Sequence, residues 1–421
     1  MKLKDDLYTI KYKNNNIVYS PLRRALFFAD DNSVEIINRY INGEDIDKTS
    51  NVWGHITKLE AMEVSAPLPH QINKSGHAII IPTQICNLGC TYCYAREAHS
   101  QKNMPIDVLK TTLDFILYNT DHKKNISFIG GGEPLVSWNL IKWSVDYLEK
   151  NKKQDDILNI GITTNATLFT DEILQYVKNH KIHIGVSFEI LSDIQNSQRP
   201  FLKGNKPTYD IVDANIKKLI QYDISYSIRS TITKLNVNRM SEMVEFVAEH
   251  YPNIKKLHLE QVTDANEDDS SFYNEYFDYF YKAKETGRRY GIYIYNSISK
   301  SIYQIKGCFC RGELCITPTG SIVACHRVSS ENEQAFPLFY YGQIRDQVVF
   351  DKDAENVYLE HTYKKRDECS NCFAYWHCAG ICPMERTELS EEQIKAKCDF
   401  VKKIIAHELF DTLSNGLKKS L

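Results

Sequence analysis

The chain has 421 residues, of which 43% are hydrophobic and 25% charged, and 51 Lys and Arg against 54 Asp and Glu give a formal net charge of −3. These proportions are typical of globular domains and exclude disordered, coiled-coil and collagen-like chains. The near-neutral charge also argues against nucleic-acid binding, which depends on a basic surface. At about 150 residues per domain, the length predicts two or three domains.

The N-terminal sequence MKLKDDLYTIKYKN lacks the apolar segment of a signal peptide, and apolar runs such as 78–82 are too short to span a membrane. We therefore expect a cytoplasmic chain with no membrane partner. In a reducing compartment, clustered cysteines are more often metal ligands or catalytic groups than disulfides. The 12 cysteines form two groups, at 86–93 and 308–398, so metal or catalytic chemistry is expected at both.

Residues 1–75 are expected to form a small α+β module. The predicted strands cover 8–12, 17–20 and 25–28. A helix is predicted over 34–41 and ends at Gly43. Two interpretations stay open for this module, because no motif in it indicates chemistry: it docks a peptide, or it is a structural extension that packs on the next domain.

Residues 76–300 alternate short β-rich runs with longer helical patterns, which is typical of βα units and a parallel sheet. The predicted strands cover 78–82, 126–129, 158–163, 183–188, 225–231 and 256–260. Helices are predicted over 106–118 and from Ser137, which is a good N-cap residue. The fold class is α/β, and six units fit a partial (β/α)6 barrel of the TIM type or a doubly wound sheet. Both architectures place the active site at the carboxyl ends of the strands.

Cys86, Cys90 and Cys93 form a C-x3-C-x2-C motif directly after the first predicted strand. Three thiolates on one tight loop suit a [4Fe–4S] cluster with one iron left open to a small molecule. A structural zinc site is the alternative, and it would need a fourth protein ligand close by.

Small and polar residues follow the next strands of the same predicted sheet. They are Gly130, Gly131, Gly132, Glu133 and Pro134 after the second strand, Asn165 in Thr-Thr-Asn after the third, Ser187 and Glu189 after the fourth, and Arg229 in the fifth. The glycines allow backbone amides and carbonyls to come close to a ligand, because they lack Cβ. We expect these residues to gather beside the cysteine triplet, although Asn165, Ser187 and Arg229 would each also suit a purely structural role.

With Tyr92 directly before the third cysteine, this set resembles the radical S-adenosylmethionine (SAM) superfamily, and the motifs occur in the expected order. The resemblance implies that 130–134 contacts the SAM amino group and that Asn165 lies near SAM. It also implies that Arg229 pairs with the SAM carboxylate, a task suited to a guanidinium. Glu189 and Ile190 stand where many relatives carry Asp and Gly of a Ser-x-Asp-Gly motif, whose role is to contact the ribose.

The resemblance implies reductive cleavage of SAM. A reduced cluster passes one electron to the sulfonium, and the resulting 5′-deoxyadenosyl radical abstracts a hydrogen from an unactivated C–H bond. The protein is then expected to orient SAM and substrate and to exclude water and oxygen, because the cofactor supplies the difficult chemistry.

Residues 301–421 hold the other nine cysteines. They are Cys308, Cys310, Cys315, Cys325, Cys369, Cys372, Cys378, Cys382 and Cys398. A hairpin is predicted with its turn at Pro318-Thr-Gly320, between Cys310 and Cys325. Nine thiols in one region suit two four-ligand sites, and two zinc ribbons are the alternative to iron–sulfur clusters.

The spacing of seven of these cysteines resembles the SPASM domain, C-x9–15-G-x4-C, then C-x2-C-x5-C-x3-C and a final C. The resemblance implies two auxiliary [4Fe–4S] clusters, hence three in the chain. The first would be held by Cys310, Cys325, Cys382 and an upstream cysteine, for which we favour Cys308 over Cys315. The second would be held by Cys369, Cys372, Cys378 and Cys398. A C-terminal helix completes this region.

SPASM enzymes mostly modify peptides or proteins, so we expect a radical SAM oxidoreductase of the peptide-maturase branch. It would form a thioether or carbon–carbon crosslink in a ribosomally synthesised precursor peptide with a leader, and residues 1–75 would bind that leader. An auxiliary cluster would accept the electron left after bond formation. A flavodoxin or ferredoxin would supply electrons.

One alternative is a formylglycine-generating enzyme like the anaerobic sulfatase maturases, or another SPASM protein-maturation oxidoreductase. Those maturases carry Asp after the cysteine equivalent to Cys325, and this chain carries His326. His326 is the candidate catalytic base, since a histidine transfers protons near neutral pH; a surface histidine is the alternative. A zinc-binding adaptor without activity is the third hypothesis.

Overall fold

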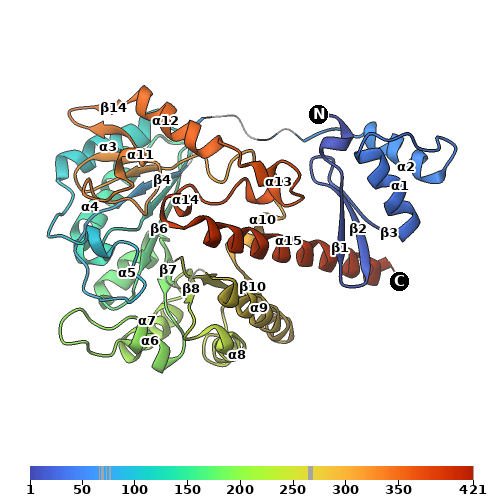
Figure 1. Cartoon of the computed structure of the whole chain (residues 1–421). Coiled ribbons are helices and arrows are strands. Elements are labelled where there is room, and N and C mark those ends of the chain that lie inside the picture. The colour runs from blue at the N-terminus through green and yellow to red at the C-terminus, as the bar shows by residue number, and fades with distance from the viewer. Residues whose placement is uncertain (66, 68–70, 73, 75–76, 264–268, 421) are drawn as a thin grey trace.

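The computed structural model describes the chain except residues 66, 68–70, 73, 75–76, 264–268 and 421 and the side chains of 416–420 (Figure 1). The strands form two sheets, one of three strands near the N-terminus and one of 11 strands in the order β10-β9-β8-β7-β6-β5-β4-β11-β12-β13-β14. Figure 1 shows the N-terminal module to one side of the large sheet, with the long helix α15 (Glu391–Ser420) running between them.

The first half of the large sheet is a parallel array whose neighbours follow chain order. Its strands are β4 (His77–Ile80), β5 (Lys123–Phe128), β6 (Ile157–Thr164), β7 (His183–Ser187), β8 (Tyr226–Ile232), β9 (Lys256–Gln261) and β10 (Tyr293–Tyr295). All six predicted strands are confirmed, and chain-order pairing excludes the doubly wound alternative, which reverses strand order at a switch point. Strand β10 was not predicted; it is only three residues long and pairs in parallel with β9.

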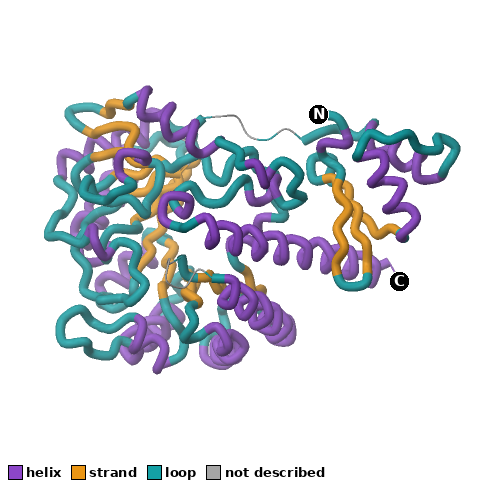
Figure 2. Tube along the Cα trace, viewed as in Figure 1, coloured by secondary structure: helices purple, strands orange, loops and turns teal. Residues whose placement is uncertain are grey.

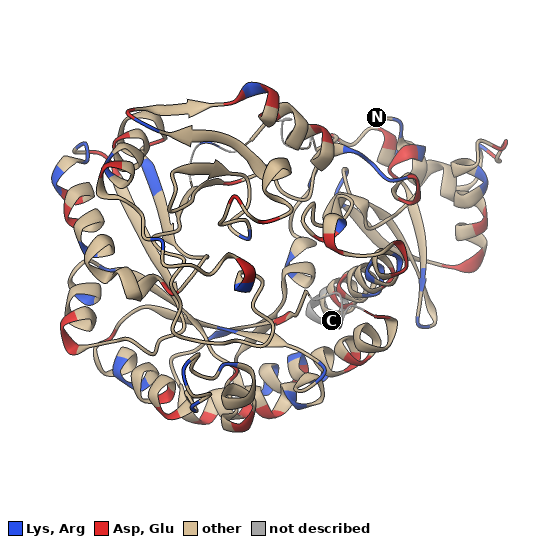
Figure 3. Ribbon diagram, turned by 60° about the vertical axis from the view of Figure 1, so that its left-hand side comes forward, with Lys and Arg blue, Asp and Glu red and all other residues tan. Residues whose placement is uncertain are grey.

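Helices cover the outer face of this array, as Figures 2 and 3 show. They are α3 (Ile106–Asn119), α4 (Trp138–Asn151), α5 (Asp171–Asn179), α6 (Ser192–Gln198), α7 (Tyr209–Gln221), α8 (Met240–His250) and α9 (Ser270–Tyr290). Their apolar faces and the strands form one core, whereas charged residues lie mostly on the outer helical surface (Figure 3). The helix predicted from Ser137 begins at Trp138, but the Ser137 hydroxyl donates to Asn103 Oδ1 (2.8 Å) instead of capping it.

The cysteine-rich region extends the same sheet. Strand β11 (Leu314–Ile316) pairs in parallel with β4, and β12 (Ser321–Val323), β13 (Tyr340–Ile344) and β14 (Val348–Phe350) continue antiparallel. The predicted hairpin is confirmed: it joins β11 to β12, with Gly320 in the left-handed region (φ +81°). The region's helices are α10 (Ser297–Ser301), α11 (Phe336–Phe339), α12 (Lys352–Tyr363), α13 (Tyr375–Cys378), α14 (Glu385–Glu388) and α15.

The N-terminal module contains β1 (Tyr8–Tyr12), β2 (Asn15–Ser20) and β3 (Ala25–Ala29) as an antiparallel sheet, followed by α1 (Asp31–Ile41) and α2 (Asn51–Glu60). The predicted strands and first helix are confirmed, and α2 was not predicted. One face of the sheet packs on α1 and α2, and the other face packs on α15 and the segment around Ala374. Strand β3 is an edge of this sheet. Within the described residues, no helix has the length and apolar character needed to cross a bilayer.

Candidate active site

A cavity of about 290 Å³ lies at the carboxyl ends of the parallel strands. Cys86, Cys90 and Cys93 line it from the loop that follows β4. Of the residues predicted to bind SAM, its wall includes Tyr92, Gly130, Gly131, Gly132, Glu133, Pro134, Asn165, Ser187 and Arg229. The structure therefore gathers the cysteine triplet and almost all of the predicted strand-end residues around one space.

The donor set fits an iron–sulfur cluster. All three cysteines of the triplet line the cavity, and burial raises the pKa of Cys86 to about 12. Three thiols that face one space can bind metal together as thiolates, since metal binding favours the deprotonated form.

The glycine motif lies against the start of the cysteine loop. Gly132 N donates to Thr83 O and Glu133 N donates to Ile85 O, both at 2.9 Å. A Cβ on Gly132 would lie 2.0 Å from Ile85 O, so only glycine allows this approach. The motif thus fixes the position of the loop through its backbone.

A second segment, 198–202, pairs with the cysteine loop on its other side. Gly89 N donates to Pro200 O, Thr91 N to Gln198 O, and Leu202 N to Asn87 O, each at 2.9 Å. This segment was not predicted, because a loop that pairs with another loop has no periodic signal in the sequence. Arg199, in its middle, lines the cavity.

Glu133 and Asn165 connect neighbouring strand ends. The buried Glu133 carboxylate accepts hydrogen bonds from Thr164 Oγ1 (2.5 Å) and Asn165 N (2.8 Å), and burial raises its pKa. The Asn165 amide Nδ2 donates to Asn87 Oδ1 (2.9 Å) in the cysteine loop. Both side chains therefore hold the cavity wall together.

Glu189 is the one predicted SAM-binding residue that does not line the cavity. Its side chain is fully buried behind the wall, where it is bonded to protein groups rather than open to a ribose. Burial raises the pKa of Glu189, and the Arg199 guanidinium is the largest opposing influence. The next residue, Ile190, has φ +67°, a backbone conformation that strongly favours glycine.

Glu260, at the end of β9, lines the cavity and was missed by the sequence analysis. Its carboxylate accepts hydrogen bonds from His258 Nε2 (2.6 Å) and Ser297 N (2.9 Å). Burial alone would raise the pKa of Glu260, but the hydrogen bond and charge of His258 and the charge of Arg229 outweigh it and lower the pKa to about 2. Glu260 could have been found from the sequence, because it is a carboxylate at the last position of the predicted strand 256–260.

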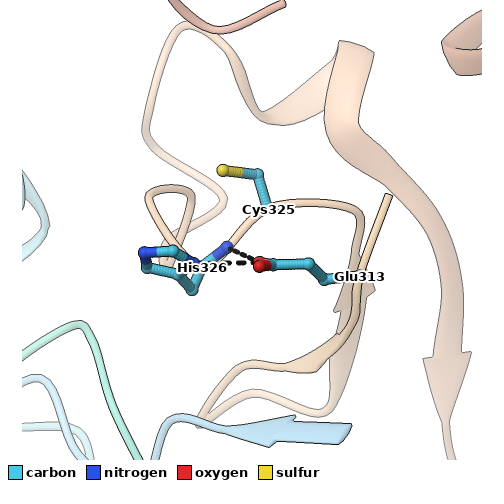
Figure 4. Close-up of side chains that lie close together, drawn as sticks. All are labelled: Glu313, Cys325 and His326. Atoms are coloured by element: carbon cyan, nitrogen blue, oxygen red, sulfur yellow. Dashed lines mark hydrogen bonds and ion pairs between the residues drawn. The ribbon is translucent and has the colours of Figure 1, made fainter. Parts of the chain in front are cut away.

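His326 lies on the cavity wall and is oriented by Glu313 (Figure 4). Glu313 Oε2 accepts both His326 Nδ1–H and the His326 backbone N–H at 2.9 Å. A histidine that donates through Nδ1 leaves Nε2 as its acceptor in the neutral form. Glu313, Cys325 and His326 each offer one atom that could bind a metal ion, and these three atoms lie within 4.8 Å of one another.

The other cysteines separate into two groups. Burial raises the pKa of Cys325, and Cys382 and Cys310 are among the nearby groups that raise it further. Burial likewise raises the pKa of Cys398 to about 12, together with Cys378, Cys369 and Cys372. Cys310, Cys325 and Cys382 are therefore neighbours, and so are Cys369, Cys372, Cys378 and Cys398. Their assignment as ligands of two clusters stays a prediction.

The two upstream candidates occupy different surroundings. Cys308 is buried in a loop, and its thiol lies near Cys310 and Tyr363. Cys315 is fully buried in β11, between β4 and β12. The choice of Cys308 remains a prediction.

Residues 80–247 match the model of the radical SAM superfamily. They form a radical SAM domain. The chain therefore contains a domain that is typical of enzymes, and the zinc-adaptor hypothesis is not retained.

Relatives with similar sequences include an uncharacterized protein, MJ0907, from Methanocaldococcus jannaschii, which is 34% identical over 171 residues. That match covers 41% of this chain and 58% of the archaeal protein. A cysteine-type anaerobic sulfatase-maturating enzyme from Clostridium novyi is 22% identical, over 70% of this chain and 84% of its own. The radical SAM cyclopropyl synthase TigE from Paramaledivibacter caminithermalis is 23% identical, over 72% of this chain and 66% of its own length.

Solved structures with the same fold extend beyond the radical SAM domain. Native anSMEcpe with bound AdoMet has a TM-score of 0.67 at 18% identity, covering 80% of this chain and 99% of its own. Streptococcus suis SuiB bound to the precursor peptide SuiA has a TM-score of 0.52 at 15% identity, and the match covers 90% of this chain and 95% of SuiB. The shared fold therefore includes the cysteine-rich C-terminal region.

Proposed function

We propose that the chain is a radical SAM peptide maturase that forms a thioether or carbon–carbon crosslink in a ribosomally synthesised precursor peptide. The observation that carries the proposal is the single cavity that joins the cysteine triplet, the glycine motif and the strand-end polar residues. The fold shared with a structure bound to a precursor peptide supports a peptide as substrate.

Cys86, Cys90 and Cys93 would hold the SAM-binding [4Fe–4S] cluster, and the two C-terminal cysteine groups would hold two auxiliary clusters. Bound there, these clusters would supply one-electron chemistry, for the reductive cleavage of SAM at the triplet and for the removal of an electron at the auxiliary sites. A one-electron donor such as a flavodoxin or ferredoxin would restore the reduced state.

The chain's own residues bind and orient the reactants. Arg229 offers SAM a guanidinium, and the backbone of 130–134 offers close N–H and C=O groups. His326, fixed by Glu313, presents Nε2 to the peptide side chain that reacts. Substrate placement by fixed groups of this kind is a large part of what such a protein contributes to rate.

The peptide's leader would bind the N-terminal module along the edge of β3. An edge strand offers unpaired backbone groups to an added strand. Beside β3 lies a cavity of about 640 Å³, whose apolar lining includes Phe27, Ile37, Val52 and Leu59. A leader with apolar side chains on alternate residues would fit this groove.

Val52→Glu places a charge in the groove, and we expect at least a tenfold weaker affinity for the precursor peptide, since a buried unpaired charge is costly. The control is Thr57→Glu, which adds the same charge to an exposed position of α2 outside the groove. Fluorescence anisotropy with a labelled synthetic precursor peptide, taken from a short reading frame found near the gene, gives the affinities. Equal affinities for both variants would contradict docking on β3.

The test of the function is metal content and SAM cleavage after anaerobic reconstitution. We expect about 12 iron and 12 sulfide per chain, and about 8 iron in the Cys86→Ala/Cys90→Ala/Cys93→Ala variant. With dithionite and SAM, the wild type should form 5′-deoxyadenosine and the triple variant none. Two or three zinc ions and no deoxyadenosine would contradict the proposal.

A second candidate function is formylglycine generation, which the long match to a sulfatase-maturating enzyme favours. Tandem mass spectrometry of the product peptide separates the two reactions. A crosslink removes two hydrogens and blocks fragmentation between the joined residues, whereas formylglycine leaves fragmentation intact and reacts with a hydrazide.

A further inference from the structure

We propose that Glu189 is a positioning residue for SAM binding: its buried carboxylate holds Tyr92 and Arg199 in place on the cavity wall. The inference rests on the proposed function, since it concerns the same cavity. It replaces the direct ribose contact expected for this position with an indirect role, through two residues that do line the cavity.

Both oxygens of the Glu189 carboxylate face hydrogen-bond donors of the protein. Oε1 accepts the Tyr92 hydroxyl and lies 3.6 Å from Arg199 Nη1. Oε2 accepts Ser230 Oγ (2.7 Å) and Thr231 N (2.9 Å) at the end of β8. One side chain with no exposed surface thereby ties a strand end to two residues of the cavity wall.

Tyr92 and Arg199 belong to the two segments whose backbones pair across the cysteine loop. Tyr92 lies between Cys90 and Cys93, and Arg199 lies between Gln198 and Pro200, whose carbonyls accept Thr91 N–H and Gly89 N–H. Arg199 Nη1 also donates to the Tyr92 hydroxyl (2.8 Å). The carboxylate therefore closes a three-way contact among the cysteine loop, segment 198–202 and β8.

Arg199 has a donor that the protein does not use. Its Nε is buried and has no hydrogen-bond partner among the described residues, although the residue lines the cavity. A buried N–H without a partner is costly, so it indicates an acceptor that binds there. Nη1 donates to the Tyr92 hydroxyl and pairs with the Glu189 carboxylate, so these two groups determine where the free donor lies.

The length of the side chain matters for this arrangement. Aspartate at this position is shorter by one methylene, roughly 1.5 Å, and cannot reach both the β8 groups and Tyr92. Glutamine keeps the length but replaces one acceptor with an N–H, which must then face a donor. Either change should displace Tyr92 and Arg199 without removing any group that touches SAM.

The experiment measures SAM affinity and the EPR spectrum of the reduced, anaerobically reconstituted enzyme. For Glu189→Gln we expect a SAM Kd at least tenfold higher, a weaker SAM-dependent change in the EPR spectrum, and iron content equal to wild type. The control is Glu355→Gln, a similarly buried carboxylate that pairs with Lys74 (2.5 Å) outside the cavity. It should keep the wild-type Kd even if it is less stable.

Tyr92→Phe is the second variant, because it keeps the ring and removes only the hydroxyl that links Glu189 to Arg199. It should also raise the SAM Kd. The double variant Glu189→Gln/Tyr92→Phe should have a SAM Kd no higher than that of the weaker-binding single variant, since both changes break the same contact. Wild-type SAM affinity in Glu189→Gln, or in Tyr92→Phe if the first variant does not fold, would overturn the inference. A wild-type enzyme that binds no SAM would instead overturn the proposed function.

Discussion

Gly132→Ala is expected to abolish 5′-deoxyadenosine formation and to remove about four iron per chain. The added Cβ would lie 2.0 Å from Ile85 O, 2.5 Å from Ile85 C and 2.7 Å from Ile85 N. These are backbone atoms of the residue before Cys86, so no side-chain rotation relieves the contact. The glycine motif and the start of the cysteine loop must separate, which displaces the first thiol of the triplet.

Iron analysis, the deoxyadenosine assay and thermal unfolding of the same samples check this result. Gly161→Ala in β6 is the matched control, because its added Cβ would find its nearest atoms at 3.7 and 3.9 Å, which is ordinary contact. That variant should keep wild-type iron and activity. Overpacking typically costs about 1–3 kcal/mol, so Gly132→Ala should also unfold at a lower temperature. Full iron and activity in Gly132→Ala would mean that the loop tolerates a wider separation.

The parallel strands were predictable because each has a local signal. Runs such as 158–163 are β-rich and are followed by a helical pattern, and the glycine and cysteine motifs occur at their ends. Parallel pairing then brings those ends to one edge of the sheet. The motif residues could therefore be placed around one cavity without any knowledge of distances.

The parts that were not predicted depend on contacts between distant segments. Arg199 lies on the cavity wall because the backbone of 198–202 pairs with the cysteine loop more than 100 positions earlier in the sequence. The resemblance implied a ribose contact for the position of Glu189, but its carboxylate is bonded to Tyr92 and Ser230 behind the cavity wall. A short strand such as β10 also has too few residues to show a period.

The cysteine-rich region shows the same limit at a larger scale. Its spacing predicts a hairpin and two ligand sets, and the hairpin is confirmed. The spacing does not indicate that β11 pairs with β4, so that Cys315 lies beside Ile79 inside a continuous sheet. Strand pairing of this kind is decided by the whole fold and not by the local sequence.

Single and double replacements of the C-terminal cysteines should divide them into two groups that do not follow sequence order. Cys382 follows Cys378 closely in the sequence, but its thiol lies near Cys310 and Cys325. Cys398, which comes later in the chain, is near Cys378 instead. We therefore expect Cys382→Ala and Cys398→Ala each to lose about four iron, but from different clusters.

The double variants decide the assignment. Cys325→Ala/Cys382→Ala should lose no more iron than either single variant, because both thiols serve one cluster, whereas Cys382→Ala/Cys398→Ala should lose about eight. Cys315→Ala is the control, and it should keep all its iron if Cys308 is the fourth ligand of the first set. Iron and sulfide analysis with Mössbauer spectroscopy measures each loss. If Cys382→Ala/Cys398→Ala loses only about four iron, Cys382 belongs to the second set and the crossover is wrong.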